Sequence, residues 1–191
     1  ELRFMLPMIS TVEEVRTVRA LLTAVETDTN GAPAMGAPTA PGHSPRIKIG
    51  VMIEVPSAAL LADRMAPLVD FFSIGTNDLA QYVLATDRTN SSVAALADTL
   101  HPAVLRLIQL TCQAAAATGI PVSICGEIGG DPAAVPLLIG LGLTELSVPV
   151  PAIPLVKEAI RRTTQAACRA LAEQALRCDD SSAVRALLVE P

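Results

Sequence analysis

The sequence predicts an α/β fold in which helices flank a parallel sheet, and three observations support this. Short apolar runs alternate with longer segments of helical periodicity along the chain of 191 residues, as in folds built from strand–helix–strand units. The apolar runs are nearly continuous, which is typical of strands that are buried on both faces. Polar residues follow directly after several of these runs. A chain of this length is expected to form one domain with a sizeable core.

Five strands are expected from the apolar runs, because each is bounded by turn residues or by a helical segment. They cover residues 2–8, 47–56, 70–75, 121–127 and 145–149. The core around them must be aliphatic, since the chain has no Trp, one Tyr and three Phe.

Helices are expected between and after these strands. They cover residues 11–26, 57–69, 78–86, 102–119, 131–142 and 154–178, the last as one helix or two. Ser10 or Thr11 can cap the first helix, because short polar side chains accept hydrogen bonds from the first turn. Gly119 is typical of a helix end, and Pro132 is expected in the first turn of its helix.

A stretch rich in Pro, Gly and Ala, around residues 28–46, interrupts this pattern. Such a composition cannot hold a helix, so we expect a flexible insert. The insert joins a helix back to a strand, which in a barrel places it at the amino-end face. Of the two histidines, His43 falls in this insert, and His101 precedes a helix that it is expected to cap or pack against.

Two architectures fit the alternation, a doubly wound sheet and a (β/α)₈ barrel of the TIM type. No Gly-rich dinucleotide motif is present, which disfavours the first. Glu54, the pair Asn77 and Asp78, and residues 125–127 each fall at the carboxyl end of an expected strand, where barrels build their active sites. Because five strand–helix units are found where a barrel has eight, either three units are present but unrecognised or the chain holds an incomplete barrel.

Composition excludes several classes of protein. No apolar run approaches the length of a membrane-spanning helix, and the N-terminus lacks the features of a signal peptide. The net charge of −5 argues against a nucleic-acid partner. The cysteines show no C-x-x-C pairing, so we expect reduced thiols in a cytoplasmic protein. They are Cys112, Cys125, Cys168 and Cys178.

Two carboxylates are candidate metal ligands. Glu54 lies in an apolar strand, where a carboxylate is costly unless it is paired or binds a metal. Asp78 is expected at the neighbouring strand end. Two carboxylates with waters and a phosphate oxygen suit Mg²⁺, whereas a structural ion pair or a helix cap is the alternative.

Three further residues are candidates for anion binding. Asn77 lies where a helix should start, so its backbone N–H can face an anion or the side chain can simply cap the helix. Arg3 and Arg88 can each clamp a phosphate or a carboxylate. For either arginine, a solvated surface position is the alternative.

Cys125, in the segment SICGE, is the candidate reactive thiol. It ends a strand and precedes a Gly–Glu turn, which would place it at the mouth of a barrel. The alternative is a small buried hydrophobe, and we expect that role for the three cysteines on helical segments.

Four segments resemble the C-terminal domain of the phosphoenolpyruvate-utilising enzymes. They read IGVMIEVPSAAL, VDFFSIGTNDLAQYVLATDRTN, LHPAVLRLI and CGEIGGDPAAVPLLIGLGLTELSV. Pyruvate phosphate dikinase and phosphoenolpyruvate synthase share the Gly-Thr-Asn-Asp and Cys-Gly-Glu turns. The residues after the first turn, and LHPAVLRLI, are most similar to the Enzyme I group, the phosphoenolpyruvate–protein phosphotransferases. The resemblance covers nearly the whole chain except the insert.

The resemblance implies a (β/α)₈ barrel that binds phosphoenolpyruvate and Mg²⁺ at its carboxyl-end mouth. It makes Glu54 and Asp78 the metal ligands, with Asp78 also near the substrate. Asn77 would contact the substrate, and Arg3 and Arg88 would hold its phosphate.

The resemblance also implies the reaction and its partners. Cys125 matches the acid that protonates the enol of pyruvate. The phosphoryl group would pass to a phosphohistidine domain and then to a phosphocarrier protein for sugar uptake, in a homodimeric enzyme. The family's first three strands, two further arginines and phosphohistidine domain lie outside this sequence, so the chain alone is expected to be inactive.

Two functions of other classes stay open. One is a barrel lyase that cleaves acyl-coenzyme A esters, which also pairs Glu and Asp around Mg²⁺. The Cys-Gly-Glu turn argues against it. The other is a non-catalytic, truncated barrel that serves dimerisation, because missing strands leave sheet edges that need cover.

Overall fold

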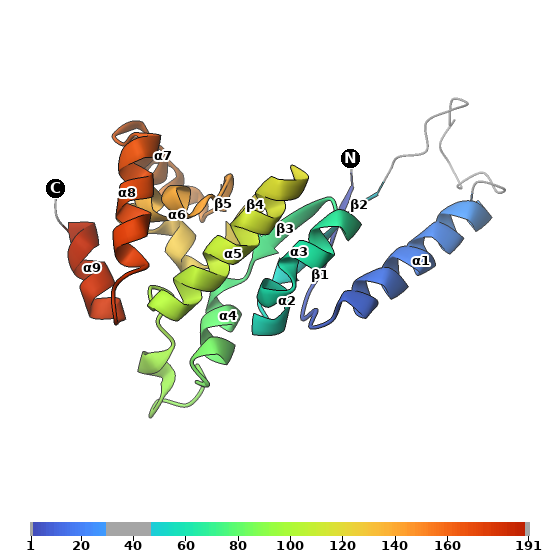
Figure 1. Cartoon of the computed structure of the whole chain (residues 1–191), viewed down its shortest axis with the longest axis horizontal. Coiled ribbons are helices and arrows are strands. Elements are labelled where there is room, and N and C mark those ends of the chain that lie inside the picture. Colours follow the sequence, from blue (N-terminus) through green and yellow to red (C-terminus); the bar gives the residue numbers. More distant parts are fainter. Residues whose placement is uncertain (1, 30–46, 190–191) are drawn as a thin grey trace.

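The computed structural model describes residues 2–29 and 47–189. Within these ranges five parallel strands form one sheet in the order β1-β2-β3-β4-β5 (Figure 1). The strands are β1 (Arg3–Leu6), β2 (Lys48–Ile53), β3 (Phe71–Ile74), β4 (Val122–Cys125) and β5 (Glu145–Ser147). Each lies inside a predicted run, so the strand predictions are confirmed.

Helices connect the strands, and α3 and α5 lie along one side of the sheet in Figure 1. The α-helices are α1 (Val12–Thr29), α2 (Pro56–Leu60), α3 (Ala62–Met65), α4 (Thr76–Val83), α5 (Pro102–Thr118), α6 (Val135–Leu141), α7 (Ile153–Arg161), α8 (Gln165–Ala175) and α9 (Ser181–Val189). Four 3₁₀ turns accompany them: η1 (Ala66–Leu68), η2 (Ala94–Leu96), η3 (Glu127–Gly130) and η4 (Val150–Ala152).

The strand order decides between the two predicted architectures. In a doubly wound sheet the chain reverses direction, so that strand order departs from sequence order. Here each strand pairs in parallel with the next one in sequence. Right-handed crossovers then place the connecting helices on the same face of the sheet. The sheet therefore has the topology of a barrel wall, and the prediction of a partial barrel is confirmed.

The two faces of the sheet differ in chemistry because side chains alternate along each strand. The helix-covered face is aliphatic, and its fully buried members include Val51, Ile53, Phe72, Ile74 and Ile124. On the other face a row of paired residues crosses four strands: Met52, Ser73, Ser123 and Glu145. This second, more polar face corresponds to a barrel interior.

The sheet is strongly curled, as a contact between its two edge strands shows. Arg3 of β1 and Glu145 of β5 form an ion pair, with 3.9 Å between Arg3 Nη1 and Glu145 Oε2. A flat five-stranded sheet would be about 19 Å wide at the usual strand spacing. The guanidinium of Arg3 also lies 5.6 Å from the centre of the Phe71 ring. The polar face is therefore concave.

Helix starts agree with the sequence in two places and differ in a third. Thr11 accepts from the backbone N–H of Glu14, and the Glu14 carboxylate accepts from the N–H of Thr11 at 2.8 Å, which is a capping box. His101 caps α5 by accepting from Ala103 N–H at 3.1 Å. Pro132, by contrast, lies in a turn before α6, whose first turn holds Pro136.

One predicted helix needs correction, and one helix was not predicted. The helix expected over 57–69 is divided into α2, α3 and η1, because Leu61 leaves helical geometry and Pro67 removes a backbone donor. Helix α1 continues through Thr29, at the edge of the insert predicted around residues 28–46. Residues 30–46, the rest of that predicted insert, lie outside the described residues. Helix α9 was not predicted.

Candidate functional site

The carboxyl ends of β2, β3 and β4 form the candidate site. Glu54 directly follows β2, α4 begins at Thr76 two residues after β3, and Cys125 is the last residue of β4. Since these three strands are parallel neighbours, the three side-chain positions share one edge of the sheet. The structure therefore brings together the main residues that the sequence singled out.

Glu54 is buried, with 3% of its surface exposed. Its Oε1 accepts a hydrogen bond from the backbone N–H of Met8 at 2.7 Å. A Cβ atom on Gly75 would lie 3.0 Å from Glu54 Oε2, so the glycine lets the chain pass close to the carboxylate. One neutral donor only partly replaces the water that this buried carboxylate has lost, so a cation at this position would be favourable.

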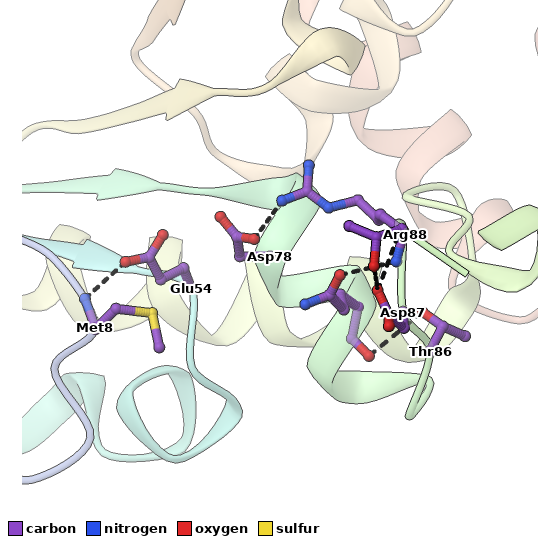
Figure 2. Close-up of polar contacts among 8 residues, drawn as sticks. Met8, Glu54, Asp78, Thr86, Asp87 and Arg88 are labelled. Atoms are coloured by element: carbon purple, nitrogen blue, oxygen red, sulfur yellow. Dashed lines mark hydrogen bonds and ion pairs between the residues drawn. The ribbon is translucent and has the colours of Figure 1, made fainter. Parts of the chain in front are cut away.

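Asp78 and Arg88 form an ion pair at the same edge (Figure 2). Arg88 Nη2 lies 2.5 Å from Asp78 Oδ1, and the backbone N–H of Arg88 donates to Gln81 Oε1 at 3.1 Å. Both side chains remain partly exposed. The chain after α4 therefore folds back and returns a guanidinium to the start of that helix.

The amino end of α4 adds polar donors to this edge. Gly75 is its N-cap, and Asn77 and Asp78 lie in its first turn. The first N–H groups of a helix have no partner within it, so they are available to an anion.

Cys125 lies half-buried between two groups of β3. Ser73 Oγ donates to Cys125 Sγ at 3.2 Å, and Sγ donates to the carbonyl oxygen of Ile74 at 3.5 Å. The next residue packs closely, because a Cβ on Gly126 would lie 2.0 Å from Thr76 Oγ1. Thr76 is fully buried, and its hydroxyl has no hydrogen-bond partner in the described part of the chain. The turn at Cys125 thus rests directly on the start of α4.

A cavity of about 450 Å³ opens beside these residues. It is lined by Asn77, Arg88, Ala94, Ala95, Ala97, Asp98, Thr99, Glu127 and Arg185. The sequence did not single out Asp98 or Arg185. Arg185 belongs to α9, for which the apolar spacing of SSAVRALLV is the available signal.

Arg3 does not join this group. It is the first residue of β1 and pairs in register with Lys48, the first residue of β2, whereas Glu54 follows the last residue of β2. Six residues of strand correspond to about 20 Å. Its predicted contact with a phosphate is untested, and its place at the amino end of the sheet gives that role no support.

The carboxylates fit a magnesium ion in part. No group of three or more His, Cys, Asp or Glu that could hold a metal occurs among residues 2–29 and 47–189. Mg²⁺, however, commonly takes one or two protein carboxylates and completes its shell with water and substrate oxygens. Glu54 and Asp78, from adjacent strand ends, match that requirement.

The remaining cysteines have structural positions. Cys112 and Cys168 are buried, as predicted, and Cys178 is half-buried. Burial raises the pKa of the Cys112 thiol to about 12, so it stays protonated and unreactive.

Among the helices of residues 2–29 and 47–189, none combines the length and the apolar character that a membrane span requires.

Known proteins share most of this sequence. A multiphosphoryl transfer protein of Rhodobacter capsulatus is 46% identical over 98% of this chain and 21% of its own length. A phosphoenolpyruvate-protein phosphotransferase of Haloferax volcanii is 46% identical over 98% of the chain and 32% of its own length. A phosphoenolpyruvate-protein phosphotransferase of Mycoplasma genitalium is 42% identical over 98% of the chain and 31% of its own length. The chain thus spans between about a fifth and a third of these relatives.

Solved structures resemble the fold at low sequence identity. A citrate lyase from Burkholderia xenovorans LB400 aligns with 96% of this chain and 60% of its own, at a TM-score of 0.57 and 18% identity. RipC from Yersinia pestis aligns with 85% of this chain and 65% of its own, at a TM-score of 0.51 and 15% identity. At such identities these matches concern the fold alone.

A family model matches residues 1–165, that of the PEP-binding domain of PEP-utilising enzymes. PEP is phosphoenolpyruvate. This match and the relatives confirm the resemblance seen in the sequence. The chain belongs to the PEP-utilising enzyme family, as its PEP-binding domain.

Proposed function

We propose that this chain is the catalytic, phosphoenolpyruvate-binding part of a phosphoenolpyruvate–protein phosphotransferase of the Enzyme I type. The observation that supports it best is the convergence of four kinds of group at one sheet edge. These are the buried carboxylate of Glu54, the Asp78–Arg88 pair, the start of α4 and the thiol of Cys125. The names of the relatives favour a phosphotransferase over a dikinase.

The substrate carries a phosphate and a carboxylate, and the site offers donors for both. Arg88 can move its guanidinium from Asp78 to a phosphate oxygen, since charge-assisted bonds to either anion are strong. Asn77 and the first N–H groups of α4 add neutral donors. Glu54 and Asp78 would hold Mg²⁺, which when bound offsets negative charge on the phosphoryl group.

The reaction breaks the bond between phosphorus and the enol oxygen and forms one from phosphorus to an imidazole nitrogen of a histidine on another domain. The electron pair remains on the enolate of pyruvate. Cys125 then gives its proton to the terminal carbon of the enolate, and the thiolate recovers a proton from solvent. The bond from Cys125 Sγ to the Ile74 carbonyl is compatible with a thiol that retains its proton before this step.

The partners follow from this proposal. The phosphoryl group would continue from the histidine to a phosphocarrier protein that serves sugar uptake. The complete enzyme would be a cytoplasmic homodimer.

A chimaera tests the function. The 191-residue chain replaces the matching segment of the H. volcanii relative. We call the resulting full-length protein the chimaera. We expect Mg²⁺-dependent pyruvate formation together with phosphorylation of a histidine. A folded chimaera that neither binds phosphoenolpyruvate nor phosphorylates histidine would reject the proposal.

The isolated chain gives a complementary test. By itself it is expected to produce no pyruvate, because the acceptor histidine and part of the arginine set are supplied by other segments. Enzyme-like turnover by the pure 191-residue chain would contradict this division of roles.

A further inference from the structure

Arg88 lies on a long connection between α4 and α5, which we call the 84–101 connector. Near Arg88 the connector is fixed to α4, because Gln81 binds the N–H groups of Thr86 and Arg88 through its backbone and side-chain oxygens. Ala85, just before Thr86, has a left-handed backbone with a φ of 52°. This end of the connector is therefore held by local contacts.

The other end of the connector is held from a distant part of the sequence. Arg185 of α9 places Nη2 2.9 Å from both carboxylate oxygens of Asp98. Asp98 Oδ1 also accepts from the backbone N–H of Leu100 at 2.9 Å. Asp98 is mostly shielded, with 21% of its side chain exposed. One carboxylate thus fixes the turn into α5 and binds the C-terminal helix.

Helix α9 is itself firmly placed. Val184, beside Arg185, is fully buried. Asp180 caps the helix by accepting from Ala183 N–H at 2.8 Å. Arg106 of α5 donates to the carbonyl oxygen of Leu176, just after α8, at 3.1 Å. The buried valine sets the rotation of α9 and thereby directs Arg185 to the connector.

Both arginines line the same cavity. Its volume is about 450 Å³, and Asp98 and three alanines of the connector, Ala94, Ala95 and Ala97, also line it. Loss of the Arg185 contact would free this part of the connector and let it move away from the site.

We propose that Arg185 is a positioning residue for Arg88: by binding Asp98 it holds the 84–101 connector so that Arg88 stays at the edge of the site, within reach of Asp78 and of a bound phosphate. Arg185 lies beyond the residues that the family model matches. Its consequence for substrate binding rests on the proposed function. If Arg88 holds the phosphate, loss of Arg185 weakens substrate binding more than it slows the reaction.

Trypsin provides a direct test on the 191-residue chain. Arg88 is the one trypsin site between Arg64 and Arg106. Cleavage there requires the guanidinium to leave Asp78 and enter the protease. The rate of cutting after Arg88 therefore reports how firmly the connector is held.

The variants separate the proposed link from general effects. Arg185→Gln removes the positive charge of the ion pair. Asp98→Asn removes the negative charge and keeps a side-chain oxygen that can accept from Leu100 N–H. We expect each to speed cleavage after Arg88 roughly threefold, as for loss of a partly exposed ion pair. The double variant should be no faster than either single one, and Arg185→Lys should recover part of the loss. Arg169→Gln, an exposed change on α8, is the control.

Three results would overturn the proposal. They are an unchanged rate in Arg185→Gln, additive effects of the two substitutions, or equal acceleration at Arg162, the C-cap of α7, which would indicate general destabilisation. In the chimaera, Arg185→Gln should raise KM for phosphoenolpyruvate and leave kcat near the parent value, and a fall in kcat alone would also contradict it. The trypsin test uses no phosphoenolpyruvate, so its failure is distinct from failure of the proposed function.

Discussion

Met8 donates its backbone N–H to Glu54 Oε1 at 2.7 Å, and this bond joins the loop after β1 to the end of β2 (Figure 2). Met8 has a left-handed backbone with a φ of 55°, which costs roughly 1–2 kcal/mol for a residue with a side chain. The carboxylate of Glu54 thus stabilises an unfavourable turn with one oxygen while the other lies beside Gly75.

Two substitutions at Glu54 separate these tasks. Glu54→Gln keeps an oxygen for Met8 N–H and removes the charge, so the chimaera should stay folded and lose its Mg²⁺-dependent activity. Glu54→Ala should also lower the free energy of unfolding by about 1–3 kcal/mol, since a buried donor loses its partner. Pyruvate formation and urea unfolding measure the two effects. Full activity of Glu54→Gln at ordinary Mg²⁺ would mean that the carboxylate is structural.

Cys125→Ala separates binding from chemistry. In the chimaera it should bind phosphoenolpyruvate as the parent does but form pyruvate roughly 10² to 10⁴ times more slowly, as expected for loss of a general acid. Calorimetric affinity and steady-state turnover are measured together. Alanine at Cys112, Cys168 or Cys178 serves as the control and should change turnover far less. Parent-like turnover, or a parallel loss of binding, would exclude Cys125 as the proton donor.

Gly126→Ala should disturb the contact between the two turns of the site. The new Cβ would lie 2.0 Å from Thr76 Oγ1, so a turn must shift, and such overpacking typically costs about 1–3 kcal/mol. Thr76→Ala in the same protein should restore part of the stability. Gly130→Ala is a suitable control, because its Cβ would make an ordinary contact of 3.4 Å with Pro149. Equal unfolding midpoints for the two single variants would show that the close approach is unimportant.

Stability above pH 9 should depend on Cys112. Its pKa is raised by burial from 9.0 to about 12 in the folded chain. Between these values the unfolded chain releases the proton and the folded chain keeps it, so stability falls as pH rises. From pH 8 to pH 10 this one thiol should lower the free energy of unfolding by ~1.4 kcal/mol. Urea unfolding of the parent should show that extra loss relative to Cys112→Ala; identical pH dependence would contradict it.

The sheet could be predicted because its signals are local. Each strand is a short apolar run, and chain direction alone places Glu54, Asp78 and Cys125 at one edge. The same rule places Arg3, near the start of the first run, at the opposite edge. The phosphate contact of Arg3 was implied by the family resemblance alone and stays a prediction.

Other features depend on packing between distant segments, for which the sequence gives no rule. The ion pair between Asp98 and Arg185 joins residues 87 positions apart. The division of the 57–69 segment at Leu61 likewise depends on how α2 and α3 each meet α5. The apolar residues of α9 have helical spacing, but over nine residues this spacing is only a weak indication of a helix.

The sequential strand order has a consequence for how such a chain assembles. No strand in residues 2–29 and 47–189 pairs with any strand except its neighbours in sequence. Each pairing closes a loop of only one strand–helix unit, although parallel pairing of this kind is slower than the pairing of a local hairpin. The sheet can therefore grow one strand–helix unit at a time, and further units can join at the free sides of β1 or β5 without threading the chain through what has already formed.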